Sequence, residues 1–501
     1  MNFRESMEYL DSVPKFSPKD VVSGAVAYEL GAMRTLMESL GNPEKQLRFV
    51  HIAGTNGKGS ASAFLSQILI ESGLRTGSFN SPAIEHFTEQ FRINGHDITE
   101  EDFAAILTRV ASQIQQNLRD GKPQPTQFEI LVAVMFLYFH EQNCDIVVLE
   151  TGMGGLLDAT NVIPSPEAAV IMTISMDHTE ILGRTLREIA FQKAGIIKEG
   201  TDVLLYPQKP EADQVFEAVC REKKARLHRI NVCRKAREYS LQGQIFDLTL
   251  EADPQISLSD MSLPESSGSE TSVRETSVPE TSMPETSVPE TSVPETSVPD
   301  EISTDNTSAS GTTIRDLFIP LLGSYQCANA SMAVAAAEIL RQKGYPITED
   351  AVRKGLKHTV WHGRFELMHK NPAVIVDGGH NPEGAAMLRD SLARYFPGQK
   401  ITFLMGILAD KDYHRVIDIV GPLAKQFYTV PVPNPRALDP GQLARELQES
   451  GYTAEACGSI EEATDKALKN CTEKDVICSF GSLYYVGRIR EHLKADLKAD
   501  E

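Results

Sequence analysis

The stretch His51-Ile52-Ala53-Gly54-Thr55-Asn56-Gly57-Lys58-Gly59-Ser60 decides the fold of this chain. It follows a short apolar run, 49–52, that predicts a buried strand, and it precedes a run, 61–71, that predicts an amphipathic helix. Glycines at such a turn let backbone N–H groups close on phosphate oxygens, and the helix start adds the positive end of its dipole. Lys58 is then placed to reach terminal phosphates and Ser60 to bind a metal ion. The stretch predicts an ATP site at which a phosphoryl group is transferred.

The spacing of this turn differs from the common G-x-x-x-x-G-K-[ST] loop. Two residues separate Gly54 from Gly57, and Gly59 stands between Lys58 and Ser60. The alternative is a glycine-rich turn without a ligand. The strand before it and the helix after it favour the phosphate site.

Length and composition indicate a globular chain of two or more domains. The chain has 501 residues, with 41% hydrophobic and 24% charged content, which is ordinary for globular proteins. We see no apolar run long enough to span a membrane, and the polar residues 1–6 do not predict a secretory signal. The seven Cys residues are scattered and include no C-x-x-C pair, so we expect neither a disulfide framework nor a zinc site. A cytoplasmic location is the expectation.

The acidic balance is concentrated in one segment. The net charge is -20, but residues 253–312 carry twelve Asp or Glu and one Arg, which leaves -9 for the rest of the chain. That remainder predicts no broad basic face, and we expect neither nucleic acid nor a membrane as a partner.

The same segment, 253–312, is of low complexity. Pro-Glu-Thr-Ser-Val repeats over 275–299, with no aromatic and almost no bulky apolar residues to offset the entropy of ordering. We predict a disordered acidic insertion that replaces a hairpin turn between two strand-like runs, 244–250 and 314–321. A partner-binding arm is the alternative.

Strands alternate with helices on both sides of this insertion. The pattern predicts strands at 145–149, 168–174, 373–376, 401–405 and 476–480, and helices at 128–141, 184–197, 384–395 and 440–449. We therefore expect an α/β fold in two units. The first is a P-loop-type parallel-sheet ATPase domain over 1–358, and the second is a smaller Rossmann-like α/β domain over 361–501.

Polar residues follow two of the predicted strands of the first unit. Glu150 ends one strand and precedes Thr151-Gly152-Met153-Gly154-Gly155, so it is a candidate Mg²⁺ ligand, with a turn-capping acid as the alternative. His178 follows the next strand at the same edge and is either a metal ligand or a solvated histidine. Lys193 lies in a predicted helix, where a solvated lysine is the simplest interpretation.

Two further motifs lie in or near the second unit. Arg364, in Trp361-His362-Gly363-Arg364, could contact phosphates through the paired N–H groups of its planar guanidinium. Asp377, in Val376-Asp377-Gly378-Gly379-His380, follows a strand and could bind a ribose or an amine. Each signal alone is weak, because Gly-Gly after a strand is usually a turn.

Taken in chain order, these segments resemble the folylpolyglutamate synthase / dihydrofolate synthase family of the Mur ligase superfamily, whose members form amide bonds at the expense of ATP. The matching blocks span nearly the whole chain outside 253–312: 51–60, 81–82, 128–129, 150–161, 177–183, 193–197, Gln326 with Asn329, 363–364, 377–381 and 481–484.

The resemblance implies roles for individual residues. It implies that 1–358 is the ATP-binding domain and that 361–501 is a glutamate-ligase domain. The implied ATP contacts are Gly54, Thr55, Asn56, Gly57, Lys58, Gly59, Ser60, Asn329, Arg364 and Asp377. The implied ligands of two Mg²⁺ sites are Ser60 for one and Ser81, Glu150 and His178 for the other. The implied catalytic residues are Lys58, His178 and Lys193, the last matching a lysine that is carbamylated in this superfamily. The implied substrate-binding residues are Thr126, Gln127, Phe128, Glu129, Leu157, Asp158, Ala159 and His380.

The implied reaction joins L-glutamate to folate or dihydropteroate through an acyl phosphate, in a chain expected to be a monomer. The sequence departs from the family pattern at Gln90, Leu156, Gln192 and Tyr325, and at Ala83, where the family often has His. These departures concern the form of the folate substrate rather than the reaction. Two alternatives remain: another amino-acid ligase of the superfamily, such as one for peptidoglycan precursors, and a nonenzymatic, nucleotide-gated binding protein.

Overall fold

The glycine-rich turn lies at the end of the central strand of a large, mostly parallel sheet. The structure, a computed structural model, describes residues 1–15, 29–250 and 312–499. Within these ranges the larger sheet has eight strands in the order β4-β3-β2-β5-β1-β6-β7-β8. Strands β2, β5, β1, β6, β7 and β8 pair in parallel, and β3 and β4 add antiparallel at one edge. The bounds are β1 Phe49–Ala53, β2 Thr76–Phe79, β3 Phe91–Ile93, β4 His96–Asp97, β5 Ile146–Glu150, β6 Ala168–Ile171, β7 Asp202–Leu205 and β8 Arg226–Arg229.

Helices cover both faces of this sheet, because successive side chains of a strand point to opposite faces. Val50 and Ile52 of β1 face a core shared with α4, α10 and α11, whereas Phe49 faces a core shared with α6. The helix α6 is buried over nearly its whole surface, as expected of a helix packed between the sheet and α5. The bounds are α4 Lys58–Glu71, α5 Glu100–Arg119, α6 Gln127–Glu141, α8 Leu186–Ala194, α9 Pro210–Glu222, α10 Gln326–Gln342 and α11 Glu349–His358.

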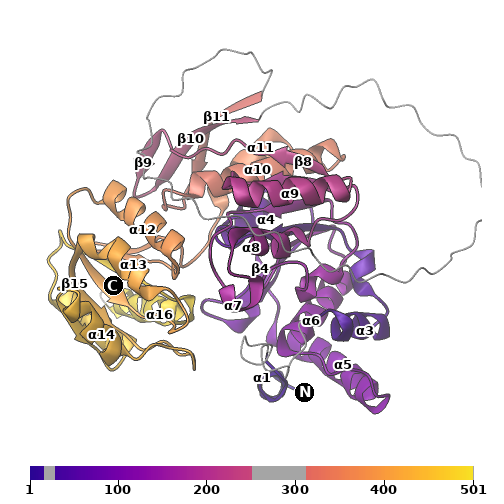
Figure 1. The fold of residues 1–501 in the computed structure, drawn as a ribbon, viewed down its shortest axis with the longest axis horizontal. Coiled ribbons are helices and arrows are strands. Elements are labelled where there is room, and N and C mark those ends of the chain that lie inside the picture. The colour runs from indigo at the N-terminus through magenta and orange to yellow at the C-terminus, as the bar shows by residue number, and fades with distance from the viewer. Residues whose placement is uncertain (16–28, 251–311, 500–501) are drawn as a thin grey trace, which may run out of the picture. The chain divides into compact units, whose positions relative to one another are not determined.

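The second sheet has six strands among the described residues, in the order β12-β13-β17-β14-β15-β16, and only β12 is antiparallel to its neighbour. Helices α12, α13 and α14 pack on one face of this sheet, and α15 and α16 pack on the other (Figure 1). The bounds are β12 Glu366–Lys370, β13 Ala373–Val376, β14 Ile401–Met405, β15 Ala424–Thr429, β16 Ala454–Ala456, β17 Val476–Phe480, α12 Pro382–Tyr395, α13 Tyr413–Val420, α14 Pro440–Glu449, α15 Ile460–Lys469 and α16 Leu483–Ala499. The expected α/β fold with a parallel-sheet domain and a smaller doubly covered domain is confirmed.

A three-stranded sheet, in the order β11-β10-β9, flanks α10. Its strands are β9 Glu238–Ser240, β10 Gly243–Leu250 and β11 Thr312–Ile319. The two runs expected to flank the insertion are therefore neighbouring strands. Thr312, which the sequence assigned to the insertion, instead begins β11. The predicted disorder of 253–311 lies outside the described residues.

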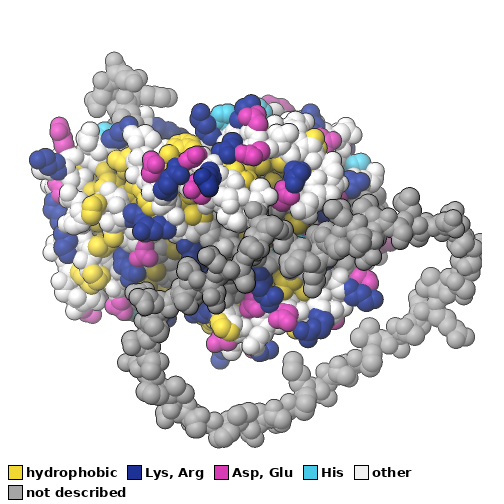
Figure 2. Space-filling view, turned by 90° about the horizontal axis from the view of Figure 1, so that it is seen from above, with side chains coloured by type: hydrophobic (Ala, Val, Ile, Leu, Met, Phe, Trp, Pro, Cys, Tyr) yellow, Lys and Arg dark blue, Asp and Glu magenta, His cyan; other side chains and the backbone are white. Residues whose placement is uncertain are grey.

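The remaining short elements connect these layers. They are α1 Phe3–Ser12, α3 Gly31–Ser39, α7 Thr179–Leu182 and the 3₁₀ turns η1 Pro43–Gln46, η2 Phe87–Gln90, η3 Ala159–Val162 and η4 Gly421–Leu423. No helix within the described ranges is long and apolar enough to cross a bilayer. On the face seen in Figure 2, Lys and Arg side chains lie among Asp and Glu side chains.

Two predicted elements are shorter than expected. The strand predicted at 168–174 ends at Ile171, because Thr173 leaves the sheet and its carbonyl accepts the Thr55 amide at 2.7 Å. The helix predicted at 184–197 covers only Leu186–Ala194. Thr185 caps its start, and at its end Gly195 packs so closely on Leu156 that an added Cβ would lie 2.2 Å from the Leu156 Cα.

A buried guanidinium on α16 joins the loop after β2 in the larger-sheet domain to β12 of the smaller sheet. Arg490 on α16 is 1% exposed; its Nε donates to Glu85 at 2.8 Å, and its Nη1 donates to Glu366. Glu85 lies in the loop after β2, and Glu366 also accepts the Gly363 amide at 2.8 Å. Residues 1–250 and 313–501 group into one unit by their contacts, and Arg490 is a buried charge that holds its two halves.

We predict that Arg490→Met lowers the free energy of unfolding by about 3 kcal/mol, because it removes the buried cation between two largely buried carboxylates and leaves Lys494 on Glu85 and His362 on Glu366. Burial alone would raise the pKa of Glu85, but the hydrogen bonds and charges of Lys494 and Arg490 hold it at about 2. The stabilisation from the ionised Glu85 is complete above the ordinary Glu pKa of about 4.3 and is lost as the pH falls through about 2. Acid therefore narrows the difference in unfolding free energy between wild type and variant. Urea unfolding, followed by the fluorescence of the single Trp, Trp361, measures this difference in unfolding free energy.

The matched control is Arg488→Met on the same helix. Arg488 pairs with Glu461 at 2.7 Å, with half of its side chain exposed, so its loss should cost less than about 1 kcal/mol. Equal costs for the two variants would contradict the role of Arg490.

Candidate active site

The turn between β1 and α4 presents an uncapped helix start. Gly57, the residue before α4, has a φ of 87°, in the left-handed region that favours glycine, and no side chain caps the helix. The amides of Lys58, Gly59 and Ser60 belong to the first turn, so they lack intrahelical partners. Together with the positive end of the helix dipole, these N–H groups favour an anion.

Close packing explains the glycines of the turn. A Cβ added at Gly57 would lie 2.7 Å from Asn329 Oδ1, and one added at Gly59 would lie 2.8 Å from the Trp361 ring. The start of α10 and the segment after α11 therefore close directly on the turn. This contact places Asn329, expected from the sequence as an ATP contact, beside the loop.

Lys58 bridges the turn and the end of β5. Its Nζ donates to the carbonyls of Gly54 at 3.1 Å and Thr55 at 3.3 Å and lies 3.7 Å from Glu150 Oε1. Glu150 is 6% exposed, and it also accepts from Asn80 Nδ2 at 2.8 Å. Burial raises the pKa of the Glu150 carboxyl, while the Lys58 charge and the Asn80 hydrogen bond oppose that rise.

Lys193 is not a solvated lysine. It is 4% exposed, and its Nζ donates to the Gly54 carbonyl at 2.9 Å, the carbonyl that Lys58 also contacts. Burial, and next the positive charge of Lys58, lower the pKa of Lys193 to about 7. The structure thus joins two of the expected catalytic residues at one carbonyl.

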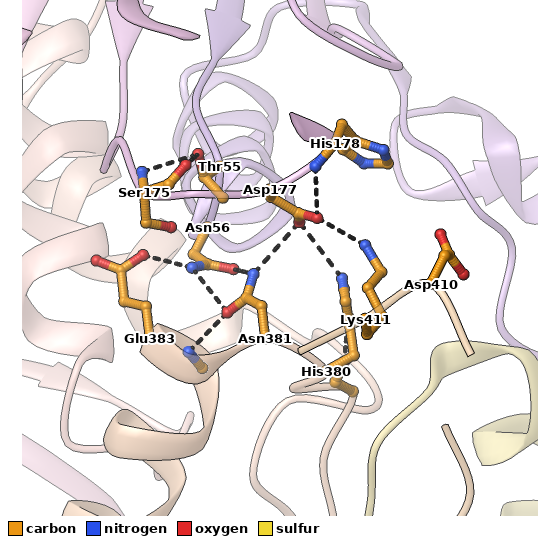
Figure 3. A network of polar contacts seen from close by, with 12 residues as sticks. Thr55, Asn56, Ser175, Asp177, His178, His380, Asn381, Glu383, Asp410 and Lys411 are labelled. Carbon is orange, nitrogen blue, oxygen red and sulfur yellow. Dashed lines mark hydrogen bonds and ion pairs between the residues drawn. The ribbon is translucent and has the colours of Figure 1, made fainter. Parts of the chain in front are cut away.

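Asp177 gathers groups from the smaller-sheet side (Figure 3). Its carboxylate accepts from Lys411 Nζ at 2.6 Å and Asn381 Nδ2 at 3.4 Å, and it lies 3.7 Å from His380 Nε2. Burial alone would raise the pKa of Asp177, but the His380 hydrogen bond and the charges of His178 and Lys411 hold it far below its ordinary value.

The turn itself also contacts the smaller-sheet side. Asn56 Nδ2 donates to Glu383 Oε2 at 2.5 Å, and its Oδ1 accepts from Asn381 at 3.2 Å. Thr173 adds a hydrogen bond to the same Glu383 oxygen at 3.2 Å. The Asn56 side chain is therefore committed to a contact with the start of α12.

Sequence reasoning missed Asn80, Glu383 and Lys411. Asn80 directly follows β2, Glu383 lies in the first turn of the helix after β13, and Lys411 lies in the loop after β14. Ligand-binding side chains gather at the carboxyl ends of parallel strands, so this common position is the signal that could have found them.

Several expected substrate contacts have structural partners here. Thr126 and Glu129 form a capping box at the start of α6, with Thr126 N donating to Glu129 Oε2 at 2.7 Å. Gln127 Nε2 donates to the Leu10 carbonyl at 3.0 Å, and Phe128 packs on Gly152. Asp158 accepts from Thr160 and from the Met153 amide, at 2.5 and 2.7 Å. Leu157 is half-buried and Ala159 is buried beside it.

The second set of expected ATP contacts forms its own turn. Asp377 is 3% exposed and accepts from Phe365 N at 2.8 Å, Tyr325 Oη at 3.1 Å and Gly379 N at 2.7 Å. It thereby fixes the backbone next to Arg364, whose charge acts on Glu150.

The expected metal ligands are only partly assembled. Ser60 and Glu150 are buried at the turn, whereas Ser81 is partly exposed and the His178 side chain is exposed at the start of α7. Among the described residues, no group of three or more His, Cys, Asp and Glu side chains is arranged to hold a metal ion. The hydroxyl and carboxylate oxygens of Ser60 and Glu150 nevertheless fit Mg²⁺, which prefers hard oxygen ligands.

Comparison with known proteins defines the class. Residues 52–259 match the Mur ligase middle domain, and residues 363–483 match the Mur ligase glutamate ligase domain. The chain is thus an enzyme, an ATP-dependent ligase of the Mur type.

Relatives specify the family. The chain is 32% identical to dihydrofolate synthase/folylpolyglutamate synthase of Bacillus subtilis (strain 168), over 93% of this chain and 95% of that protein. It is 31% identical to folylpolyglutamate synthase of Lacticaseibacillus casei, over 98% and 99% of the two chains. The ADP complex of Mycobacterium tuberculosis folylpolyglutamate synthase superposes with a TM-score of 0.78 at 26% identity, covering 98% of both chains. The chain belongs to the dihydrofolate synthase / folylpolyglutamate synthase family.

We predict that Lys58→Ala lowers kcat by about 100-fold or more, since it removes a cation from the charge-stabilising site while leaving the hydrophobic cores untouched. Steady-state ADP release measures the loss, and the thermal midpoint reports the fold. The control is Lys354→Ala, which removes an exposed lysine of α11 that pairs with Asp350 at 2.8 Å. Near-normal turnover of the Lys58 variant would exclude its phosphate-binding role.

Proposed function

We propose that this chain adds L-glutamate to a folate-type carboxylate through an acyl phosphate. The observation that carries the proposal is the pair of lysines, Lys58 and Lys193, on the Gly54 carbonyl beside an uncapped helix start and a buried carboxylate. Such a site binds and stabilises phosphate charge, and acyl-phosphate chemistry needs no covalent enzyme intermediate.

Two steps account for the reaction. A carboxylate oxygen of the folate attacks the γ-phosphorus of ATP, and ADP leaves. The glutamate amine, after losing a proton, attacks the acyl carbon and forms the C–N bond. The bond between the acyl carbon and the bridging oxygen then breaks, and inorganic phosphate leaves with that oxygen. Lys58 and the first-turn amides of α4 neutralise charge on the transferred group, so that positioning and electrostatics supply the catalysis.

We propose that Ser60 is a ligand of one Mg²⁺ ion and that Ser81, Glu150 and His178 hold a second. When bound, these ions would neutralise phosphate charge. The buried Glu150 carboxylate needs a positive charge close to it, and Lys58 alone pairs with it among the described residues.

We further propose that the smaller-sheet domain, 361–501, and the larger-sheet domain, 1–358, act together on ATP. Asn329, Arg364 and Asp377 are proposed ATP contacts, and His380 is a proposed substrate contact at the Asp177 group. Thr126–Glu129 and Leu157–Ala159 are proposed to line the pterin pocket behind the turn. A monomer in a reducing cytoplasm fits the seven free cysteines.

A substrate panel tests the proposal. We expect product from dihydropteroate, tetrahydrofolate or both when each is mixed with ATP, Mg²⁺ and L-glutamate, with the added glutamate read by mass. ADP release should require both the folate and the amino acid. Turnover of neither pterin substrate would contradict the proposed function.

We propose that Lys193 is carbamylated. The neutral amine reacts with CO₂, and a lysine with a pKa of about 7 supplies that form at physiological pH, whereas an ordinary lysine with a pKa of about 10.4 does not. The modification replaces a buried cation by a carboxylate-like oxygen donor beside the turn, where it can support a metal ion.

We predict a carbamate signal after incubation with ¹³C-bicarbonate, with the initial rate of labelling rising from about pH 6 to about pH 8 as Lys193 loses its proton. Lys193→Met should abolish the signal and lower kcat about 100-fold, the cost of losing a group that supports a metal ligand. Lys198→Met is the control: Lys198 is a partly buried lysine that donates to the Asn161 carbonyl at 3.1 Å. A carbamate signal that persists in Lys193→Met would contradict the carbamylation of Lys193.

A further inference from the structure

Two cysteine thiols lie in hydrogen-bonding contact at the first turn of α10. Cys327 is the second residue of this helix and is fully buried, whereas Cys233 lies in the segment after β8 and is partly exposed. The backbone holds the pair together: the Cys233 amide donates to Ser331 Oγ at 3.0 Å, and the Ser331 hydroxyl donates to the Cys327 carbonyl at 2.8 Å. A solvent-accessible thiol therefore has a buried thiol as its neighbour.

Cys233 differs in reactivity from the other cysteines of the chain, all of which lie within the described residues. The hydrogen bond from Cys327 lowers the pKa of Cys233 to about 7. Burial raises the pKa of five of the others, and the hydrogen bond with Cys233 raises that of Cys327. Because the thiolate is the form that reacts with oxidants, Cys233 is the thiol expected to react first.

The buried thiol also supports the loop that leads into α10. Cys327 Sγ donates to Gln244 Oε1 at 3.4 Å, and Gln244 Nε2 donates to the three carbonyls of 321–323 at 2.6, 2.8 and 3.0 Å. Gln244 is fully buried, so water does not readily replace the thiol. The same turn of α10 carries Asn329, whose Oδ1 lies close to Gly57 of the β1–α4 turn. A change at Cys327 can therefore reach the nucleotide turn through one turn of helix.

We propose that Cys233 and Cys327 are a modification site at which hydrogen peroxide forms a reversible disulfide, and that this disulfide weakens nucleotide binding. The Cys233 thiolate first attacks one oxygen of the peroxide; the S–O bond forms, the O–O bond breaks, and the hydroxide that leaves takes up a proton to become water. The Cys327 sulfur, losing its proton, then attacks the sulfur of the Cys233 sulfenic acid. The S–S bond forms, the S–O bond breaks, and a second water leaves, so that two thiols are oxidised and one peroxide is reduced.

The disulfide removes the S–H donor of Cys327, and the buried Gln244 oxygen loses that hydrogen bond. We expect the Kd of a non-hydrolysable ATP analogue with Mg²⁺ to rise about 3- to 10-fold, the size of effect that follows from the loss of one neutral hydrogen bond. This second part of the inference rests on the proposed contact of Asn329 with ATP, whereas the disulfide itself does not.

Peptide mapping tests the disulfide. The full chain is treated with hydrogen peroxide, its free thiols are blocked with N-ethylmaleimide, and trypsin is added. Cleavage after Lys and Arg leaves Cys233 in peptide 230–234 and Cys327 in peptide 316–341. We expect these two peptides to be linked, the link to be lost on reduction with dithiothreitol, and Cys233→Ser to give no link.

The matched control is Cys471→Ser, which removes a partly exposed cysteine whose pKa burial raises, and this variant should still give the linked peptides. If peroxide leaves Cys233 unmodified, or oxidises it to the sulfinic acid without linking it to Cys327, the modification site is wrong.

Calorimetry with the ATP analogue and Mg²⁺ tests the effect on the nucleotide. Peroxide should raise the Kd in wild type and in Cys471→Ser, dithiothreitol should restore it, and Cys233→Ser should show no change. A linked chain that binds the analogue as tightly as the reduced chain would overturn the coupling. If the reduced chain does not bind the analogue at all, the proposed nucleotide site falls and the coupling falls with it, while the peptide map decides the disulfide independently.

Discussion

The site depends on two ammonium groups that converge on one backbone carbonyl. Lys58 and Lys193 both donate to the Gly54 oxygen, and Glu150 lies 3.7 Å from Lys58. Burial, and next the repulsion from the Lys58 charge, lower the pKa of Lys193 to about 7. The Glu150 carboxylate offsets part of this positive charge, and a bound phosphate or the loss of the Lys193 proton offsets more of it. Phosphate binding and modification of Lys193 would each reduce the net positive charge at the Gly54 carbonyl.

The smaller-sheet side is joined to the turn by polar contacts rather than by an apolar core. Asn56 reaches Asn381 and Glu383, and Asp177 holds Lys411. Contacts of this kind exchange readily for water, whereas the hydrophobic cores of the two sheets do not. A site divided between rigid sheets but closed by exchangeable hydrogen bonds can admit substrates and exclude water by small movements. The buried Arg490, by contrast, holds α16 to Glu85 of the larger-sheet domain and to Glu366 of β12.

Local pattern was sufficient for much of the fold. Residues 373–376, 401–405 and 476–480 form the predicted strands because continuous apolar runs bury both faces of a parallel sheet. The sequence pattern gave a wrong boundary where tertiary contacts set the end of an element. The strand predicted to reach residue 174 ends at Ile171, because the chain turns there to contact the loop after β1. The same limit applies to the site. Asn80 acquires its role from Glu150, 70 positions away, and Glu383 from Asn56, 327 positions away. No short-range periodicity records such pairs, although the carboxyl ends of strands indicate where to look for them.

A crystal structure of the chain with a non-hydrolysable ATP analogue and Mg²⁺ tests the central claim most directly. The account predicts the triphosphate on the first-turn amides of α4, with Lys58 turned from the Gly54 carbonyl to the terminal phosphate, one metal ion on Ser60 and a second on Glu150. A nucleotide bound away from the β1–α4 turn, or a Lys58 that keeps its carbonyl contacts while the phosphates lie elsewhere, would contradict it.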